Sequence, residues 1–222
     1  MGHLRIWKYI SVPWVTSSLL FFLAFLFLAF FQEISNTFLT SELVLQLLKN
    51  TLLLTILVGL ITFLIAAPFA ILTSLYKFPG HNFFSWSLSL PLVFPAYIYA
   101  FIFVGGLEYS GPIASWFRDF GIILPSIRNI LGASLVMSLA LYPYIFLLMK
   151  AQIKHTGIPI FKAAKTLGKS DVAAIRTILL PTLKPSIFAG VILAMLETLA
   201  DFGGVSTLRI ETFTVAIYNA WF

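Results

Sequence analysis

Two acidic side chains stand within an otherwise apolar stretch near the end of this 222-residue chain. Glu197 and Asp201 are four residues apart, so on a helix they would share one face. Carboxylates inside a membrane are costly and normally face a bundle interior or a wet cavity. Hard cations prefer oxygen ligands, so this pair is a candidate lining of a cation pathway. The alternative is that both acids bond Ser or Thr hydroxyls, or Arg209, and hold an outer gate together.

Other patterns that could carry chemistry are weak. His3, His81 and His155 are far apart in the sequence, which argues against a metal cluster. A phosphate loop of the form GxxxxGKS or GxxxxGKT does not occur, so we expect this chain to bind no cofactor and to hydrolyse no ATP. No nucleophile and base stand in a convincing arrangement, and no catalytic residue is predicted. The absence of cysteine excludes disulfides and thiolate metal sites.

Membrane helices are the elements that must position the two acids. The chain is 60% hydrophobic and only 10% charged, whereas soluble domains are about 25% charged. A helix needs about 20 apolar residues to cross a bilayer. We therefore predict an all-α fold, a polytopic transmembrane helical bundle with about five spans. These spans are residues 11–31, 51–73, 85–106, 130–149 and 186–206.

Prolines and aromatic residues mark features of these predicted elements. Several prolines fall inside the spans, where neighbouring helices can satisfy the backbone groups that they free, among them Pro68, Pro91, Pro95 and Pro143. Between the third and fourth spans, residues 113–120 can form a short interfacial helix. Trp116 and Phe117 would then lie at headgroup depth, as in the aromatic belts of membrane proteins.

The distribution of basic residues predicts the orientation. With the amino terminus in the cytoplasm, the inner segments carry 10 of the 14 Lys and Arg residues and one acid, Asp171. The outer segments carry the other four basic residues and five acids. Cytoplasmic segments of membrane proteins are enriched in Lys and Arg, so we predict a cytoplasmic amino terminus. The net charge of +6 then follows from topology, and we expect no nucleic-acid partner.

A long basic loop, residues 150–185, separates the fourth and fifth spans and holds seven of the 14 basic residues. Such a loop at the membrane face indicates a partner. We predict a helix over residues 159–167, because apolar residues recur there at i, i+3, i+4 and i+7. These residues are Ile160, Ala163, Ala164 and Leu167. The alternative is a basic segment held only by anionic lipid, at about 1 kcal/mol per Lys or Arg.

The second part of the loop contains the signals for a turn and a second helix. Gly168 suits a helix stop through its tolerance of positive φ. Ser170 and its neighbours form a capping sequence for a helix that runs towards Leu180. Pro181 and Pro185 are expected to bend the chain back into the membrane. The loop is therefore predicted to be two short helices lying at the inner face.

The spacing of small and apolar residues in this loop resembles the cytoplasmic "EAA" loop of ABC importer permeases. The matching positions are Lys162, Ala163, Ala164, Gly168, Ile178, Leu180 and Pro181. In that family the loop forms coupling helices that sit in a cleft of an ATP-hydrolysing subunit. The family's leading glutamate is replaced by Lys162, and a carboxylate at that position can pair with a basic residue of the ATPase. The lysine puts that one ion pair in question, but it does not affect docking of the loop by its shape.

A second resemblance covers residues 197–206, 212–214 and 217–222, which are similar to ferric-iron permeases of the same superfamily. Such permeases are usually two fused six-span halves. The resemblance therefore implies that residues 1–222 form a single permease domain without its final helix, either an amino-terminal half or a truncated form. It implies ferric iron as the cargo. Related branches move sulfate, molybdate, thiamine or polyamines, and the shared loop does not separate them.

The resemblance also implies partners and a location. The expected partners are ABC ATPase subunits that carry ATP and Mg, an extracytoplasmic substrate-binding protein, a second permease half or subunit, and membrane lipid. The expected location is the bacterial inner membrane. An ion-driven secondary carrier is one alternative, and it would place paired acids near the bilayer midplane. An intramembrane enzyme is another, but it would need a catalytic set within the spans. The loop spacing favours the importer over both.

Overall fold

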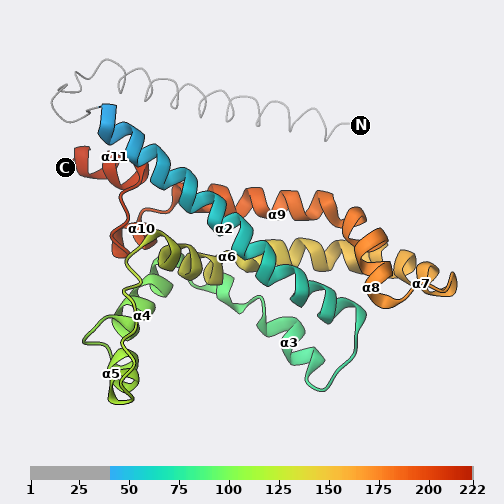
Figure 1. Ribbon diagram of the computed structural model, residues 1–222. Coiled ribbons are helices and arrows are strands. Elements are labelled where there is room, and N and C mark those ends of the chain that lie inside the picture. The colour runs from blue at the N-terminus through green and yellow to red at the C-terminus, as the bar shows by residue number, and fades with distance from the viewer. Residues whose placement is uncertain (1–40, 222) are drawn as a thin grey trace, which may run out of the picture. The chain divides into compact units, whose positions relative to one another are not determined.

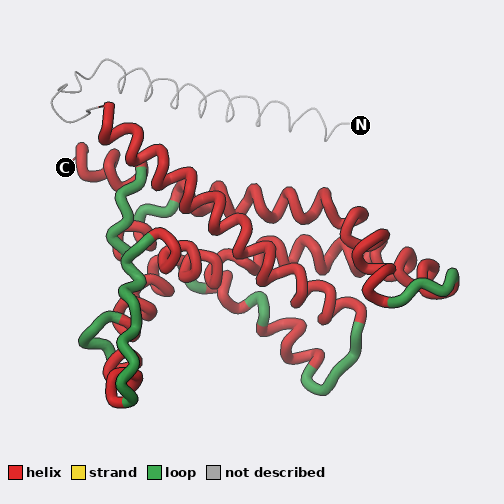
Figure 2. The backbone as a smooth tube through the Cα atoms, in the orientation of Figure 1, coloured by secondary structure: helices red, strands yellow, loops and turns green. Residues whose placement is uncertain are grey.

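The structure is a computed structural model that describes residues 41–221. The chain divides into two compact units, Met1–Val44 and Leu45–Phe222, and the helical bundle belongs to the second. Within the described residues all regular structure is helical (Figures 1 and 2), which confirms the all-α prediction. The first predicted span, residues 11–31, lies outside the described residues.

Three helical runs in the described part are long and apolar enough to cross a membrane: Glu42–Leu75, Ile130–Thr166 and Asp171–Ala200. Helix α2 (Ser41–Leu75) contains the whole second predicted span, and α6 (Ile130–Gln152) contains the fourth. Pro68 in α2 and Pro143 in α6 do not end their helices. A bent pair of helices counts as a fourth span if it is taken as one. The total of five spans remains a prediction.

The third predicted span, residues 85–106, is broken rather than continuous. It consists of α3 (His81–Ser87), η1 (Leu90–Val93) and α4 (Ala96–Leu107), with a bend of 93° at the break. Phe94 is extended, at φ −103° and ψ 132°, because a following proline disfavours the helical conformation. Pro95 then lies at the N-terminal end of α4, where it has no backbone N–H to donate. The Tyr99 hydroxyl donates to the Pro91 carbonyl at 3.2 Å and so satisfies a group near the break.

The fifth predicted span, residues 186–206, begins and ends earlier than the sequence indicates. It is α9 (Leu180–Ala200), and Asp201 ends it with a ψ of 109°. Two short helices follow, α10 (Gly203–Thr207) and α11 (Phe213–Trp221). The Thr214 hydroxyl donates to the Leu199 carbonyl at 2.7 Å and so holds α11 against the end of α9.

Helix α6 lies at the centre of the second unit and packs along α9 (Figure 1). The two helices approach each other closely at Gly190, where an added Cβ would lie 2.7 Å from the Cα of Ile145. Small residues allow this kind of close packing between membrane helices. In the most apolar 18 residues of each helical run, 61% are buried in the run that contains α6, but only 22% in the run that contains α9. Helix α9 therefore contributes one packed face and leaves the rest of its surface open.

The short helix between the third and fourth spans is present as α5 (Pro112–Asp119), in agreement with the predicted segment 113–120. Trp116 is exposed and its ring meets Phe117 edge-on, with centroids 5.1 Å apart. The Arg118 guanidinium lies over the Tyr109 ring and donates to the Tyr109 carbonyl at 2.8 Å. Its position at headgroup depth remains a prediction.

Candidate docking hairpin and membrane acids

Residues 150–185, which we call the hairpin, form the connected ends of two long helices (Figure 1). On one limb α6 continues through a π-helical turn, η2 (Ile153–Gly157), into α7 (Ile158–Thr166). On the other, α8 (Asp171–Ala174) continues through a second π-helical turn, η3 (Ile175–Leu179), into α9. The predicted helix over residues 159–167, the turn and the second helix are all present, but neither helix is separate from the long helix next to it. Each limb is an uninterrupted helical extension of a membrane helix.

The prolines at the base of the second limb do not break the helix, and the bend expected at them remains a prediction. Pro181 and Pro185 both lie within the continuous helix formed by η3 and α9. The wider turn η3 precedes Pro181 and relieves the clash of its ring with the preceding turn. The Gln152 side chain donates to the Thr182 carbonyl at 2.8 Å and so ties the two limbs together.

The tip of the hairpin is a tight turn with glycine at its critical position. Gly168 has φ +81°. Its N–H donates to the Lys165 carbonyl at 3.0 Å, and the next N–H, of Lys169, donates to Ala164 at 3.2 Å. These two bonds define a Schellman motif, which needs a left-handed residue. Ser170 then caps α8 by accepting from the Ala173 N–H at 3.3 Å. The predicted stop at Gly168 and the start after Ser170 are both confirmed.

The residues of the loop motif divide between the inside of the hairpin and its surface. Ala164 is only 2% exposed, Ile178 and Leu180 are half-buried, and α7 packs against α8 and η3. Lys162, Ala163, Gly168 and Pro181 are exposed. The motif residues before and at the turn, 162–168, thus lie near the tip, whereas Ile178, Leu180 and Pro181 lie nearer the base of the second limb. Ala164 contributes to the internal packing of the limbs and not to their outer surface.

Two exposed apolar side chains flank the turn. Leu167 is 81% exposed and Val172 is 65% exposed, on either side of Gly168. The sequence placed Leu167 on an apolar helix face but gave no role to Val172. The available signal was a valine within a polar segment, one residue after the capping sequence. Exposed basic residues surround this pair: Lys162, Lys165, Lys169 and Arg176.

One carboxylate joins the hairpin to α2. Asp171 forms an ion pair with Lys165 across the turn, and its other oxygen accepts a hydrogen bond of 2.8 Å from the Tyr76 hydroxyl. Tyr76 follows the last residue of α2. Burial, and then the hydrogen bond to Asp171, raise the pKa of the Tyr76 hydroxyl above its ordinary value. The hydroxyl is therefore a protonated donor at neutral pH.

The base of the hairpin is held by a second polar contact. The Lys150 ammonium donates to the hydroxyl of Ser85 at 2.6 Å and to the Ser85 carbonyl. Ser85 belongs to α3, so this contact fixes the first limb to the broken third span. The Phe146 ring lies 5.1 Å from the same ammonium and adds a cation–π contact.

The two membrane acids do not share one environment. Glu197 lies on the exposed side of α9 and has no hydrogen bond or ion pair with any residue in 41–221. Asp201 follows α9, and its Oδ1 accepts from the Gly204 N–H at 3.0 Å. A Cβ on Gly204 would lie 2.5 Å from the Asp201 Oδ2, so the cap requires glycine there. Asp201 thus bonds the backbone at the start of α10 through Oδ1, with Oδ2 buried and unpaired, whereas Glu197 is exposed.

The expected pairing of these acids with Arg209 or with hydroxyls is not present in residues 41–221. The ion pair near the end of α4 joins the Arg128 Nε to Glu108 Oε1 at 2.6 Å. The described part also contains no group of three or more His, Cys, Asp or Glu that could hold a metal ion. His81 instead bonds the Thr73 carbonyl at 2.8 Å, just before the end of α2.

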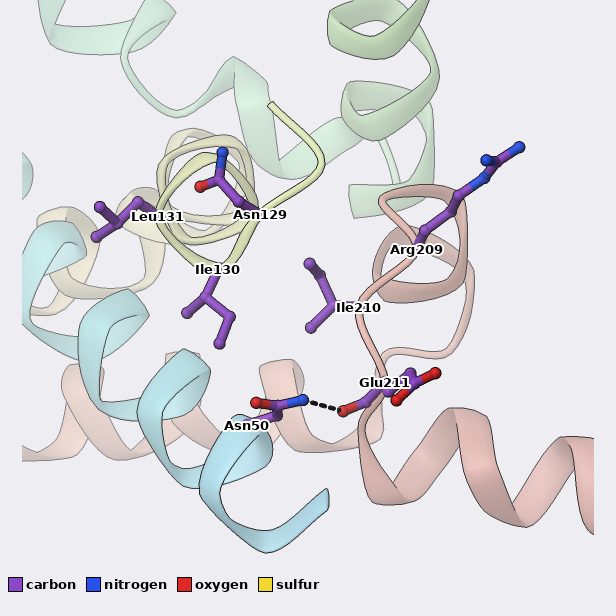
Figure 3. Close-up of a pocket in the computed structure, with 7 residues that line it drawn as sticks. All are labelled: Asn50, Asn129, Ile130, Leu131, Arg209, Ile210 and Glu211. Atoms are coloured by element: carbon purple, nitrogen blue, oxygen red, sulfur yellow. Dashed lines mark hydrogen bonds between the residues drawn. The ribbon is translucent and has the colours of Figure 1, made fainter. Parts of the chain in front are cut away.

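An open depression of about 610 Å³ lies at the opposite end of α6 from the hairpin (Figure 3). It is lined by Asn50, Asn129, Ile130, Leu131, Arg209, Ile210 and Glu211. The Asn50 amide donates across it to the Glu211 carbonyl at 3.0 Å. Arg209 has a positive φ of 57°, and its side chain points away from the depression in Figure 3.

The helical runs, the hairpin and the membrane acids define a polytopic helical membrane protein with one prominent polar extension. Residues 65–219 match the profile of the family described as binding-protein-dependent transport system inner membrane component. That match covers most of the chain, and the chain belongs to this family. The family and the apolar helices place it in the bacterial inner membrane.

Characterised relatives of this chain are named for different cargoes. The Fe(3+)-transport system permease protein FbpB 2 of Haemophilus influenzae is 31% identical over 79% of this chain. The molybdenum transport system permease protein ModB of Escherichia coli is 30% identical over 75% of it. The sulfate transport system permease protein CysT of Salmonella typhimurium is 25% identical over 59%. The matches span 31%, 76% and 46% of these three relatives, so the chain represents part of their length.

Two solved structures share the fold at low identity. A bacterial alginate ABC transporter, in complex with alginate pentasaccharide-bound periplasmic protein, aligns with a TM-score of 0.58 and 18% identity. The alignment covers 97% of this chain and 85% of that one. An amino acid ABC transporter solved with histidines aligns with a TM-score of 0.54 and 16% identity, over 80% of this chain and 76% of that one. The fold is that of ABC transporter permeases.

Proposed function

We propose that this chain is a membrane-spanning permease subunit of an ATP-driven importer, and that the hairpin docks onto a separate ATPase subunit. The observation that carries the proposal is the exposed apolar pair at the hairpin tip, Leu167 and Val172, within a member of this family. Full burial of a leucine side chain is worth about 1.5–3 kcal/mol. A partner groove that covers the tip would gain that free energy.

The docking surface combines this apolar pair with positive charge. Lys162, Lys169 and Arg176 are exposed around the tip and form no ion pair with residues 41–221. Asp171, the acid at the tip, is engaged by Lys165 and Tyr76. The surface offered to a partner is therefore apolar at the centre and basic at the rim. Lys162 in place of the family's glutamate fits a groove with acidic rather than basic edges.

The direct test is co-purification with the ATPase, using two matched substitutions. Leu167 and Ile123 are both 81% exposed, and they lie beyond opposite ends of α6. Leu167→Asp should weaken ATPase binding about tenfold or more, since 1.4 kcal/mol corresponds to a factor of ten. Ile123→Asp introduces the same charge far from the hairpin and should bind normally. If Leu167→Asp also binds normally, the hairpin tip is not the docking surface.

The remaining partners belong to the same proposal. ATP and Mg would be bound and hydrolysed by the ATPase subunit, because the chain lacks a phosphate loop. A substrate-binding protein would deliver the cargo on the extracytoplasmic side. A second permease half or subunit would cover the exposed side of α9, where the unpaired Glu197 lies. A carboxylate within a membrane helix needs such a polar or wet neighbour.

For the cargo we propose ferric iron, with molybdate and sulfate as the alternatives that the relatives favour. The iron permease match covers 79% of this chain at 31% identity, and the molybdenum permease match covers 75% at 30% identity. A strain that lacks this gene should lose uptake of radioactive iron and keep uptake of molybdate and sulfate. If only molybdate uptake or only sulfate uptake is lost, that oxyanion and not ferric iron is the cargo.

A further inference from the structure

Helix α2 has cross-element polar contacts at each of its ends. At the hairpin end, Tyr76 donates to Asp171 at 2.8 Å. Asp171 is also the partner of Lys165, so one carboxylate holds both sides of the turn and the end of α2. A movement of the hairpin tip therefore acts on the contact at Tyr76.

At the other end, α2 holds the segment that connects α10 and α11. The Asn50 amide donates to the Glu211 carbonyl at 3.0 Å, and the Thr51 hydroxyl accepts from the Phe213 N–H at 3.1 Å (Figure 3 shows the first). The Gln46 amide adds a bond of 3.2 Å to the Glu211 carboxylate. Two of these bonds go to backbone groups, so α2 fixes the path of this segment and not only one side chain.

Between these ends, the contacts of α2 with other helices are mostly apolar. Buried residues Leu54, Val58, Ala66 and Ala70 pack in the core. The hydroxyls of Thr55 and Thr62 bond carbonyls of α2 itself, and the Ser138 hydroxyl reaches the Val58 carbonyl at a long 3.4 Å. Apolar contacts are non-directional and tolerate small shifts, whereas hydrogen bonds depend steeply on geometry. The directional contacts of α2 with other elements therefore lie mainly near its two ends.

The helix is also stiff enough to carry a displacement. It is continuous from Ser41 to Leu75, and at about 1.5 Å per residue the stretch from Thr51 to Tyr76 spans roughly 38 Å. We propose that α2 acts as a strut: a displacement of the hairpin tip moves α2 along its axis and shifts the 209–213 segment at the opposite membrane face. Tyr76, Asp171, Asn50 and Thr51 are then positioning residues for coupling. The inference rests on the proposed docking of the hairpin.

The test measures the far end of the strut while the ATPase acts on the near end. Because the chain has no cysteine, Arg209→Cys gives a single reactive thiol at an exposed position of the 209–213 segment. In the purified complex of permease and ATPase, its rate of reaction with a maleimide is compared without nucleotide and with ATP and Mg. We expect a change of about fivefold or more, the lower range of coupling between sites.

Breaking either end of the strut should remove this change. Tyr76→Phe deletes one hydroxyl, and Thr51→Val deletes one acceptor at the other end. Each should reduce the nucleotide-dependent change to less than about twofold, and the pair together should do no more, since contacts in series are not additive. Tyr99→Phe is the control, because it also removes one tyrosine hydroxyl bond, to the Pro91 carbonyl, and that bond does not involve α2.

The outcomes separate the strut from the docking. If the Tyr76→Phe variant still binds the ATPase and still shows the full nucleotide-dependent change in labelling rate, the strut proposal is wrong and the docking proposal stands. If the ATPase does not bind the Arg209→Cys chain at all, the proposed function fails and the strut falls with it. The thermal unfolding temperature of each variant is measured in detergent. If it equals that of the parent, a lost change in labelling rate is due to the missing contact and not to misfolding.

Discussion

At the scale of single residues, the adjacent alanines of the loop motif have opposite environments. Ala164 is 2% exposed within the hairpin, whereas Ala163 is exposed. We expect Ala164→Glu to destabilise the protein by more than about 2 kcal/mol, because it buries an unpaired charge. Ala163→Glu should leave the melting temperature in detergent unchanged and weaken ATPase binding. Equal melting temperatures for both variants would contradict this assignment.

Asp201 provides a second prediction at this scale. Its Oδ1 accepts the Gly204 N–H, and an asparagine side chain has an oxygen at the same place. Asp201→Asn should therefore keep the stability of the parent, and Asp201→Ala should lose about 1 kcal/mol, the usual value of a helix cap. Thermal unfolding measures both. If Asp201→Asn folds normally but no longer transports, the charge itself serves the cargo pathway.

At the scale of elements, the packing of α6 on α9 depends on the missing side chain of Gly190. An added Cβ would lie 2.7 Å from the Ile145 Cα, and backbone cannot move aside as a side chain can. We expect Gly190→Leu to force the helices apart and lower the melting temperature strongly, by the cost of overpacking, about 1–3 kcal/mol. Gly105→Ala, with no atom within 4 Å of its Cβ, is the control and should not lower it.

The sequence predicted these elements where a local rule determines them. Gly168 was identified as a stop because positive φ favours glycine, and Ser170 as a cap because of its side-chain oxygen. The break at Phe94 and Pro95 was not predicted, because two prolines within a span are compatible with a kink or with a full break. The continuous limbs were also missed, since Pro181 and Pro185 suggested a bend and π-helical turns have no local sequence rule.

The environments of Glu197, Asp201 and Ala164 could not be predicted from the sequence for a different reason. Spacing placed the two acids on one helix face, but where α9 ends decides which of them becomes a cap. The motif similarly grouped two alanines, but the packing of α7 on η3 decides which one is exposed. These are tertiary properties, and they determine which residues can meet a partner.

At the scale of the whole molecule, the open side of α9 is the surface that needs a neighbour. We expect Leu196→Cys, at a residue that is 56% exposed on this side, to form a disulfide with a second permease subunit in oxidised membranes. Leu52 is exposed to a similar degree on α2, so Leu52→Cys is the control and should remain monomeric on a non-reducing gel. Equal cross-linking at both positions would show random collision rather than an interface through α9.

The π-helical turns in the two limbs have a consequence for the direction in which the hairpin tip faces. Each such turn holds one residue more than an α-helical turn, and an α-helix advances about 100° per residue. Deleting Thr156 from η2 and Thr177 from η3 would restore ordinary winding in both limbs. The tip would then rotate by roughly a quarter of a circle about the limb axes. Leu167 and Val172 would face a different direction around those axes.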